Sequence, residues 1–315
     1  MLYGSNRDRR NPAASSSQTV WNSNDFNLTV GSCRADMMAG VDISKVQSGY
    51  FSDQENIEAF IEIGIARVTA DLPNRIRFAD FGGGTGVLTT QVSIHLATHG
   101  HKIHSIVVDA NDQFLEQARG SCSEAVLADL ETCQIKHCDL ITMRAVNHYN
   151  PLVKQQKILN NVYRSMSPGS FLVSQISSGS TENCCLRSEV SNLMSLGRST
   201  CSDDFHWTTV DDYLDLLREA GFANSACVGE APGSVWRAED LWNRFNLNAT
   251  RQAELVEDAD AQAALSRRRE TFFRESQHLC QTYDENYSRD ITGLNTDDNG
   301  EYIIHFKYPV IISRK

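Results

Sequence analysis

The chain has 315 residues, enough for one large domain or for a core domain with additions. Its formal net charge of −11 argues against the broad basic surface that nucleic-acid-binding proteins use against phosphates, so we expect no nucleic-acid partner. No stretch reaches the roughly 20 apolar residues that cross a bilayer, and the polar start lacks the apolar core of a signal peptide. We therefore expect a cytoplasmic protein without a membrane partner.

The first part of the chain predicts a tail and then a helix. Residues 1–18 are polar and rich in Ser, Asn and Arg, so we expect a disordered tail, and residues 19–72 predict an N-terminal helical cap. Apolar side chains of this cap recur at spacings of three and four, as on one face of a helix: Ile57, Phe60, Ile61, Ile65 and Val68. The helix should end before Pro73, with Gly64 a mild weakness in its middle.

The middle of the chain, residues 73–230, alternates short apolar runs with helical patterns, which is typical of a parallel sheet flanked by helices. Strands are expected near residues 75–81, 103–110, 133–137, 138–146, 170–176, 226–231 and 301–313, and helices near 87–100, 111–120, 151–166 and 208–222. The pattern predicts an α/β fold with a seven-stranded, mostly parallel, doubly wound sheet. Residues 231–298 are charged and helical in propensity, so we expect a helical insertion or lid before a final core strand at 299–315.

A glycine-rich turn is the strongest signal in the sequence. An apolar strand ends and a helix begins at the segment Asp80-Phe81-Gly82-Gly83-Gly84-Thr85-Gly86. Alternate glycines let the backbone turn sharply and approach a ligand where a Cβ would clash. The dinucleotide fingerprint G-x-G-x-x-G would need a glycine in place of Val87, and no other frame restores it. A nicotinamide-dependent oxidoreductase is therefore the weaker alternative.

The spacing acid-x-G-x-G-x-G resembles motif I of the class I, Rossmann-like S-adenosylmethionine-dependent methyltransferases. The resemblance implies S-adenosylmethionine as cofactor and S-adenosylhomocysteine as product. It further implies that Asp80 helps to hold the amino group of the cofactor's methionine moiety. The backbone that would line the methionine and ribose is that of Gly82, Gly83, Gly84, Thr85 and Gly86.

Further cofactor contacts are expected along the next strands. Asp109, followed by Ala110, ends the second strand, where a carboxylate can accept both ribose hydroxyls, although Asn111 and Asp112 compete with it as caps of the next helix. By the same resemblance, Asp129 and Leu130 belong to the element that recognises adenine, and residues 138–141 and 166–176 resemble the family's fourth strand and the approach to its fifth. Arg144 either contacts the cofactor's carboxylate or a substrate anion, or makes an ordinary salt bridge.

The segment leaving the fourth strand should lie beside the reacting methyl group, because ligands of an open α/β sheet bind beyond the carboxyl ends of its strands. His148 is the candidate general base or substrate-orienting residue, and a structural histidine is the equally weighted alternative. Tyr149 and Asn147 are further candidates. This segment lacks the Asn/Asp-Pro-Pro-Tyr/Phe motif of amino methyltransferases acting on DNA bases and glutamine, which favours a metabolite as substrate.

Aromatic residues in the two additions could enclose that substrate. Tyr50 and Phe51 precede the N-terminal helix and Trp236 opens the insertion, although packing between the additions and the sheet explains them more simply. His95 and His99 have the helical spacing of a metal pair, but they lie at the far end of their helix and we predict no metal.

These observations predict transfer of a methyl group to an O, N or C atom of a small molecule. The lid-like additions resemble those of natural-product methyltransferases, which implies specialised biosynthesis. A non-catalytic protein that binds S-adenosylmethionine is a further alternative, and a homodimer is compatible with the sequence.

Overall fold

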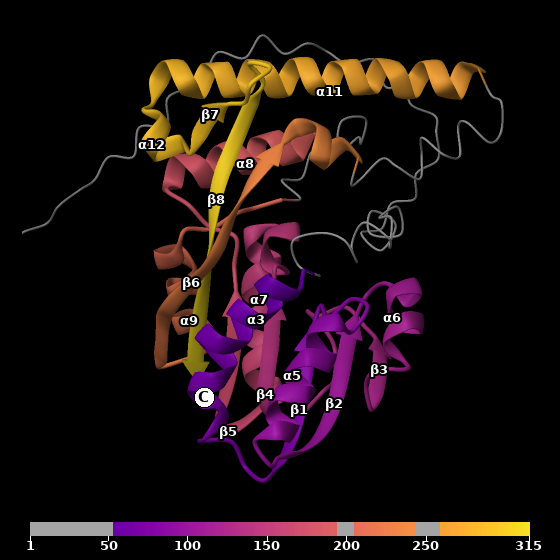
Figure 1. The fold of residues 1–315 in the computed structure, drawn as a ribbon, viewed down its shortest axis with the longest axis vertical. Helices are drawn as coiled ribbons and strands as arrows, with labels where there is room; N and C mark the ends of the chain where they lie inside the picture. Colours follow the sequence, from indigo (N-terminus) through magenta and orange to yellow (C-terminus); the bar gives the residue numbers. More distant parts are fainter. Residues whose placement is uncertain (1–52, 194–204, 244–258) are drawn as a thin grey trace, which may run out of the picture.

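In the computed structural model, residues 53–193, 205–243 and 259–315 are described (Figure 1). The predicted tail and the first part of the predicted N-terminal cap lie outside the described residues. No described helix combines the length and the apolarity that a membrane span requires.

One mixed sheet forms the centre of the molecule. Its strand order is β3-β2-β1-β4-β5-β8-β6, with the short β7 paired to β8. In chain order the strands are β1 (Arg75–Phe81), β2 (Lys102–Asp109), β3 (Glu124–Leu127), β4 (Cys138–Arg144), β5 (Met166–Gln175), β6 (Asn224–Arg237), β7 (Leu294–Thr296) and β8 (Tyr302–Arg314). Strands β1 to β5 are parallel, and β8 is antiparallel to both β5 and β6. The predicted α/β fold is confirmed, and β7 is one strand more than the seven expected.

Helices cover both faces of the sheet because its central strands are apolar on both sides (Figure 1). The helical elements of the core are α3 (Gln54–Phe60), η3 (Ile61–Ile65), α4 (Ala66–Thr69), α5 (Val87–Thr98), α6 (Asp112–Ala118), η4 (Asn147–Tyr149), α7 (Leu152–Ser165) and α9 (Val210–Ala220). One core cluster joins the N-terminal helix and α5 to the sheet, and another joins α7 and α9 to it. Within β2, Val107 packs toward α6 whereas Ile106 and Val108 pack in the cluster of α7 and α9.

The N-terminal helix is continuous through α3, η3 and α4, and it begins at an Asp53 cap whose carboxylate accepts the backbone N–H of Asn56. Its apolar face packs on the sheet, as the spacing predicts. Gly64 is more than a weak point. A Cβ at this position would come within 2.6 Å of Val173 Cγ1 and 2.9 Å of Val310 Cγ1, so the absence of a side chain lets the helix approach the sheet closely.

Replacing Gly64 by alanine should therefore destabilise the fold. Overpacking costs about 1–3 kcal/mol, and the better helix propensity of alanine returns at most about 1 kcal/mol. We expect a net loss in the free energy of unfolding, measured by denaturant titration. Gly120→Ala is the matched control, because an added Cβ there has no atom within 4 Å. Equal stability of both variants would show that the helix can move away from the sheet at no cost.

The third strand lies earlier in the chain than predicted. The apolar pattern predicts it at residues 133–137, whereas β3 is Glu124–Leu127 and pairs with the end of β2. Cys133 and Ile135 are nevertheless buried, in the core cluster beside α7. These side chains are apolar because they are buried, although they do not belong to a strand. A short apolar run in the sequence does not distinguish a buried loop from a buried strand.

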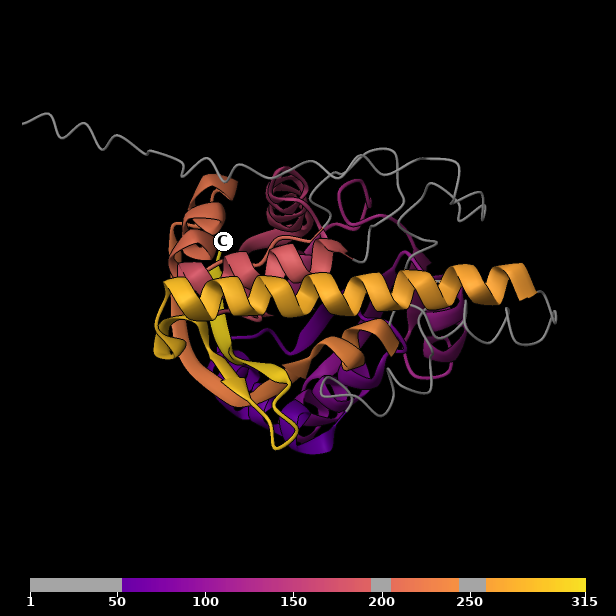
Figure 2. The same ribbon diagram turned by 90° about the horizontal axis from the view of Figure 1, so that it is seen from above.

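A second layer continues the sheet beyond the core. β6 and β8 extend past the other strands, and their pairing continues as far as Arg237 and Ile303, so the start of the predicted helical insertion (231–237) is strand (Figure 1). Two helices pack against this extension: α8 (Thr181–Asn192), which has no counterpart among the helices expected from the sequence, and α11 (Ala259–Asn286). Seen from above, α11 lies across this end of the molecule (Figure 2).

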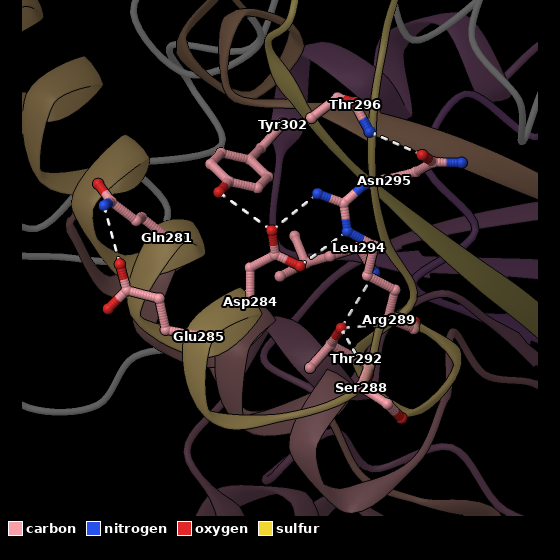
Figure 3. A network of polar contacts seen from close by, with 10 residues as sticks. All are labelled: Gln281, Asp284, Glu285, Ser288, Arg289, Thr292, Leu294, Asn295, Thr296 and Tyr302. Carbon is pink, nitrogen blue, oxygen red and sulfur yellow. Dashed lines mark hydrogen bonds and ion pairs between the residues drawn. The ribbon is translucent and has the colours of Figure 1, made fainter.

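A polar network joins the end of α11 to the short helix α12 (Arg289–Thr292) and to β8 (Figure 3). Asp284 accepts two hydrogen bonds from the Arg289 guanidinium, at 2.8 and 2.7 Å, and a third at 3.3 Å from the Tyr302 hydroxyl. These contacts with Arg289 hold the pKa of Asp284 below its usual range. The network fixes the return of the chain from the second layer into the last strand of the core.

Candidate functional site

The glycine turn between β1 and α5 has the backbone that only glycine adopts readily. Gly82, Gly84 and Gly86 have φ angles of +74°, +56° and +78°, in the left-handed region. The backbone N–H of Gly82 donates to the carbonyl of Val108 at 2.7 Å, which joins the turn to the end of β2. The alternate glycines of the sequence are thus the alternate left-handed positions of the turn.

The three positions differ in what surrounds them. An added Cβ at Gly82 would lie 2.4 Å from Val146 Cγ2, and one at Gly86 would lie 2.9 Å from Ser121 Oγ. At Gly84 an added Cβ meets no atom within 4 Å. The turn is therefore closed by protein on two sides and open at Gly84, which is the cradle that a cofactor lying on the backbone would fill.

Asp80 lies beneath this turn and is 1% exposed. Its two carboxylate oxygens accept hydroxyl hydrogen bonds from Thr89 and Thr142, each at 2.7 Å. Burial raises the pKa of Asp80, and the two threonine hydroxyls together with Arg144 oppose that rise. These contacts support the turn from below, and the implied contact with the cofactor's amino group stays a prediction.

Asp109, at the end of β2, faces the open part of the turn. Its Oδ2 accepts the backbone N–H of Gly84 at 2.9 Å, and its Oδ1 accepts that of Asn111 at 2.9 Å. Asn111, rather than Asp109, caps α6 with its side chain. Burial raises the pKa of the Asp109 carboxyl. The sequence thus placed the acid correctly beside the glycines, and Ala110, which follows it, is exposed.

Both residues of the predicted adenine-binding element, Asp129 and Leu130, already make contacts within the protein. Leu130 packs in the core cluster, so its backbone rather than its side chain remains for a ligand. Asp129 is exposed and forms an ion pair with Lys154 at 2.5 Å, a partner that sequence reasoning missed. Its other oxygen accepts the backbone N–H of Glu131 at 2.9 Å. A contact of Asp129 with adenine stays a prediction.

Thr85 and Arg144 are both buried. The Arg144 Nε donates to Gln175 Oε1 at 2.6 Å, across the neighbouring strands β4 and β5, and the guanidinium lies 5.8 Å from the ring centroid of Phe60. The charge of Arg144 also acts on Asp80. Arg144 therefore lies between the N-terminal helix and the carboxyl end of the sheet. A contact of Arg144 with the cofactor's carboxylate or with a substrate anion stays a prediction.

The segment after β4 forms the short turn η4, which holds Asn147, His148 and Tyr149. His148 is 7% exposed and its ring stacks on Trp207, with centroids 4.8 Å apart and planes inclined by 17°. The His148 carbonyl accepts the backbone N–H of His206 at 3.0 Å. Asn147 is 4% exposed, and its amide oxygen and nitrogen have no hydrogen-bond partner among the described residues. The aromatic support from residues 205–207 comes from a distant segment and was not predicted.

A cavity of about 50 Å³ lies beside His148 and Tyr149. Its other walls come from the second layer and the segment before α9: Ser177, Arg187, Ser191, Phe205, Trp207, Trp236, Leu241, Phe306 and Tyr308. Trp236 also lines a cavity of about 260 Å³ between α11 and β8. The structure thus brings Trp236 near His148, whereas Tyr50 and Phe51 lie outside the described residues.

Comparison with known proteins agrees with this geometry. Residues 79–174 match the family model described as a methyltransferase domain. The YcgJ protein of Bacillus subtilis shares the fold with a TM-score of 0.57 and 13% identity, over 84% of this chain and 99% of that chain. A Bacillus halodurans protein provisionally described as a methyltransferase gives 0.55 and 15%, over 82% and 98%. No curated protein matches the chain by sequence.

The family match covers β1 to β5, which includes the glycine turn, Asp109 and the segment around His148. The two structural neighbours show that the fold around it is that of class I methyltransferases. Residues 79–174 therefore form a methyltransferase domain, within a chain that has the fold of the class I, S-adenosylmethionine-dependent methyltransferases.

Proposed function

We propose that the protein methylates an O, N or C atom of a small-molecule metabolite. The observation that supports this most directly is the arrangement of the open cradle at Gly84, the Asp109 carboxylate that faces it, and a small aromatic-walled cavity beside His148. A cavity of about 50 Å³ fits part of a small molecule, and the net charge of −11 disfavours binding to the phosphates of a nucleic acid.

The roles of the residues follow from this arrangement. Gly82, Gly84 and the backbone between them would hold the methionine and ribose parts of S-adenosylmethionine, and Asp109 would accept the ribose hydroxyls. The cofactor supplies an electrophilic methyl group on a positively charged sulfur. The protein then has to align the acceptor atom and remove its proton. His148 is held for that task by its stack on Trp207.

A turnover assay tests the proposal. The panel contains small molecules with hydroxyl groups, amines and acidic C–H groups, and the production of S-adenosylhomocysteine is measured. With an active acceptor, His148→Ala should lower kcat by about 10²–10⁴-fold and leave the Kd for S-adenosylhomocysteine unchanged. His278→Ala is the control, because His278 is exposed on α11. If no panel member is methylated, the small-molecule proposal fails. If His148→Ala turns over like wild type, His148 is structural.

A further inference from the structure

Arg187, in the middle of α8, is a buried cation whose charge is not matched by an acid. It is 4% exposed, and its guanidinium lies between the rings of Trp207 and Phe306, 4.7 and 4.2 Å from their centroids. Its Nη2 donates to Ser177 Oγ at 2.6 Å. No Asp or Glu of the described residues forms an ion pair with it; the ionisable side chains around it are those of Cys184, Tyr308 and Tyr149.

Burial lowers the pKa of Arg187 to about 10, so the side chain stays protonated at neutral pH. A buried charge is costly unless it is paired, and such unpaired groups in folded proteins are concentrated at functional sites. Cation–π contacts with Trp207 and Phe306 compensate only part of the lost hydration. The position therefore suits an anion that arrives with a ligand.

Two further buried donors line the same cavity. Ser191, one turn further along α8, and Trp207 have side chains whose Oγ and Nε1 have no hydrogen-bond partner among the described residues, and the same is true of Arg187 Nη1. Guanidinium and indole nitrogens can only donate hydrogen bonds. Together the three groups form a donor-rich wall that requires acceptor atoms opposite it.

We infer that this cavity binds the carboxylate of the substrate, which makes the substrate a small organic acid. The inference rests on the proposed function and specifies its substrate class. A carboxylate offers acceptor oxygens in the geometry that a guanidinium matches. The cavity volume of about 50 Å³ is sufficient for a group of that size.

The carboxylate anchors the substrate, and its oxygens are not the atoms that are methylated. An oxygen that is paired with Arg187 has its electron density drawn into hydrogen bonds, which makes it a poor nucleophile. His148 and Tyr149 line the same cavity, so the body of an anchored acid would pass beside His148 toward the carboxyl end of β4. The acceptor atom would then lie on that body, at a distance from the carboxylate set by the cavity.

Calorimetry with saturating S-adenosylhomocysteine tests the inference on the full chain. Acetate, benzoate, phenylacetate and 3-phenylpropionate are each titrated beside their primary amides, with inorganic phosphate as a further probe. We expect at least one acid to bind more than tenfold tighter than its amide. Equal affinity of every acid and amide, or a preference for phosphate over all the carboxylates, would overturn the assignment.

Variants locate the binding. Arg187→Met should weaken acid binding more than tenfold and Ser191→Ala severalfold, whereas Arg218→Met, at an exposed arginine on α9, should change nothing. S-adenosylhomocysteine affinity should be the same in all of them. Thermal unfolding of Arg187→Met should begin no earlier than in wild type, since an unpaired buried charge is removed. Unchanged acid binding in both Arg187→Met and Ser191→Ala overturns the inference.

The outcomes also separate the inference from the proposed function. If wild type binds S-adenosylhomocysteine but shows no preference for acids, the carboxylate site is ruled out and the small-molecule proposal stands. A methyl ester as the product of an accepted acid contradicts the anchoring role. Failure of wild type to bind S-adenosylhomocysteine at all would instead remove the cofactor site itself.

Discussion

Gly84→Val is expected to weaken the binding of S-adenosylhomocysteine by more than 100-fold while the chain still folds. Gly84 has a φ of +56° and an added Cβ would meet no protein atom within 4 Å, so the new side chain would occupy the space that the cofactor needs. A branched side chain in the left-handed region costs about 1–2 kcal/mol of strain, which is a loss of stability separate from the loss of binding. Calorimetric titration and thermal unfolding measure the two effects.

Gly100→Val is the matched control for this prediction. Gly100 follows α5 at its far end, has a φ of +87°, and is likewise open to an added Cβ. Both variants should therefore lose similar stability, and only Gly84→Val should lose the ligand. Equal binding by the two variants would mean that the open side of the turn is not where the cofactor lies.

Asp109→Asn is expected to weaken S-adenosylhomocysteine binding by about 10–100-fold, the usual worth of hydrogen bonds to a charged group. Asparagine can keep one backbone hydrogen bond, to Gly84 or Asn111, but it has a single acceptor oxygen where the ribose would need two. Ser123→Ala, in the loop before β3, is a control, because the Ser123 side chain contacts Ser105 and not the turn.

The pH dependence gives a second test of Asp109. Burial raises the pKa of its carboxyl, and the ionised form is the one that accepts hydrogen bonds from both ribose hydroxyls. Affinity of wild type for S-adenosylhomocysteine should therefore fall as the pH is lowered through this raised pKa. Asp109→Asn has no such group and should show a flatter profile. Parallel profiles in the two proteins would assign the titration elsewhere, with Asp80 as the next carboxyl to examine.

The second layer, which comprises the extension of β6 and β8 together with α8 and α11, supplies part of the wall of the cavity beside His148. β6 and β8 carry Trp236, Phe306 and Tyr308 beyond the core, and α8 brings Arg187 to them. The predicted role of Trp236 in substrate binding stays a prediction, but its position between two cavities gives it a means of limiting substrate length. A substrate anchored at Arg187 would extend toward the larger cavity only past this ring.

The sequence alone determined the features that depend on neighbouring residues. Alternate glycines after an apolar strand permit a sharp turn with positive φ angles, and an acid that ends the neighbouring parallel strand lies at the same edge of the sheet as that turn. The strand–helix alternation likewise fixed the fold class, because each apolar run needs a covering helix. For the same reason the amphipathic face of the N-terminal helix was evident without coordinates.

Only the tertiary structure decided where distant segments converge. Residues 133–137 and β3 are both apolar enough for a strand, and pairing with the edge of β2 chose between them. From the sequence, Gly64 is only a residue that weakens a helix; the structure shows that Val173 and Val310 leave no room for a side chain there. Arg187 and Ser191 lie one turn apart on α8, but no sequence spacing connects them to Trp207, because their common cavity is formed by segments that meet only through long-range packing. Local pattern records the backbone's preferences, whereas a substrate pocket depends on contacts between residues far apart in the chain.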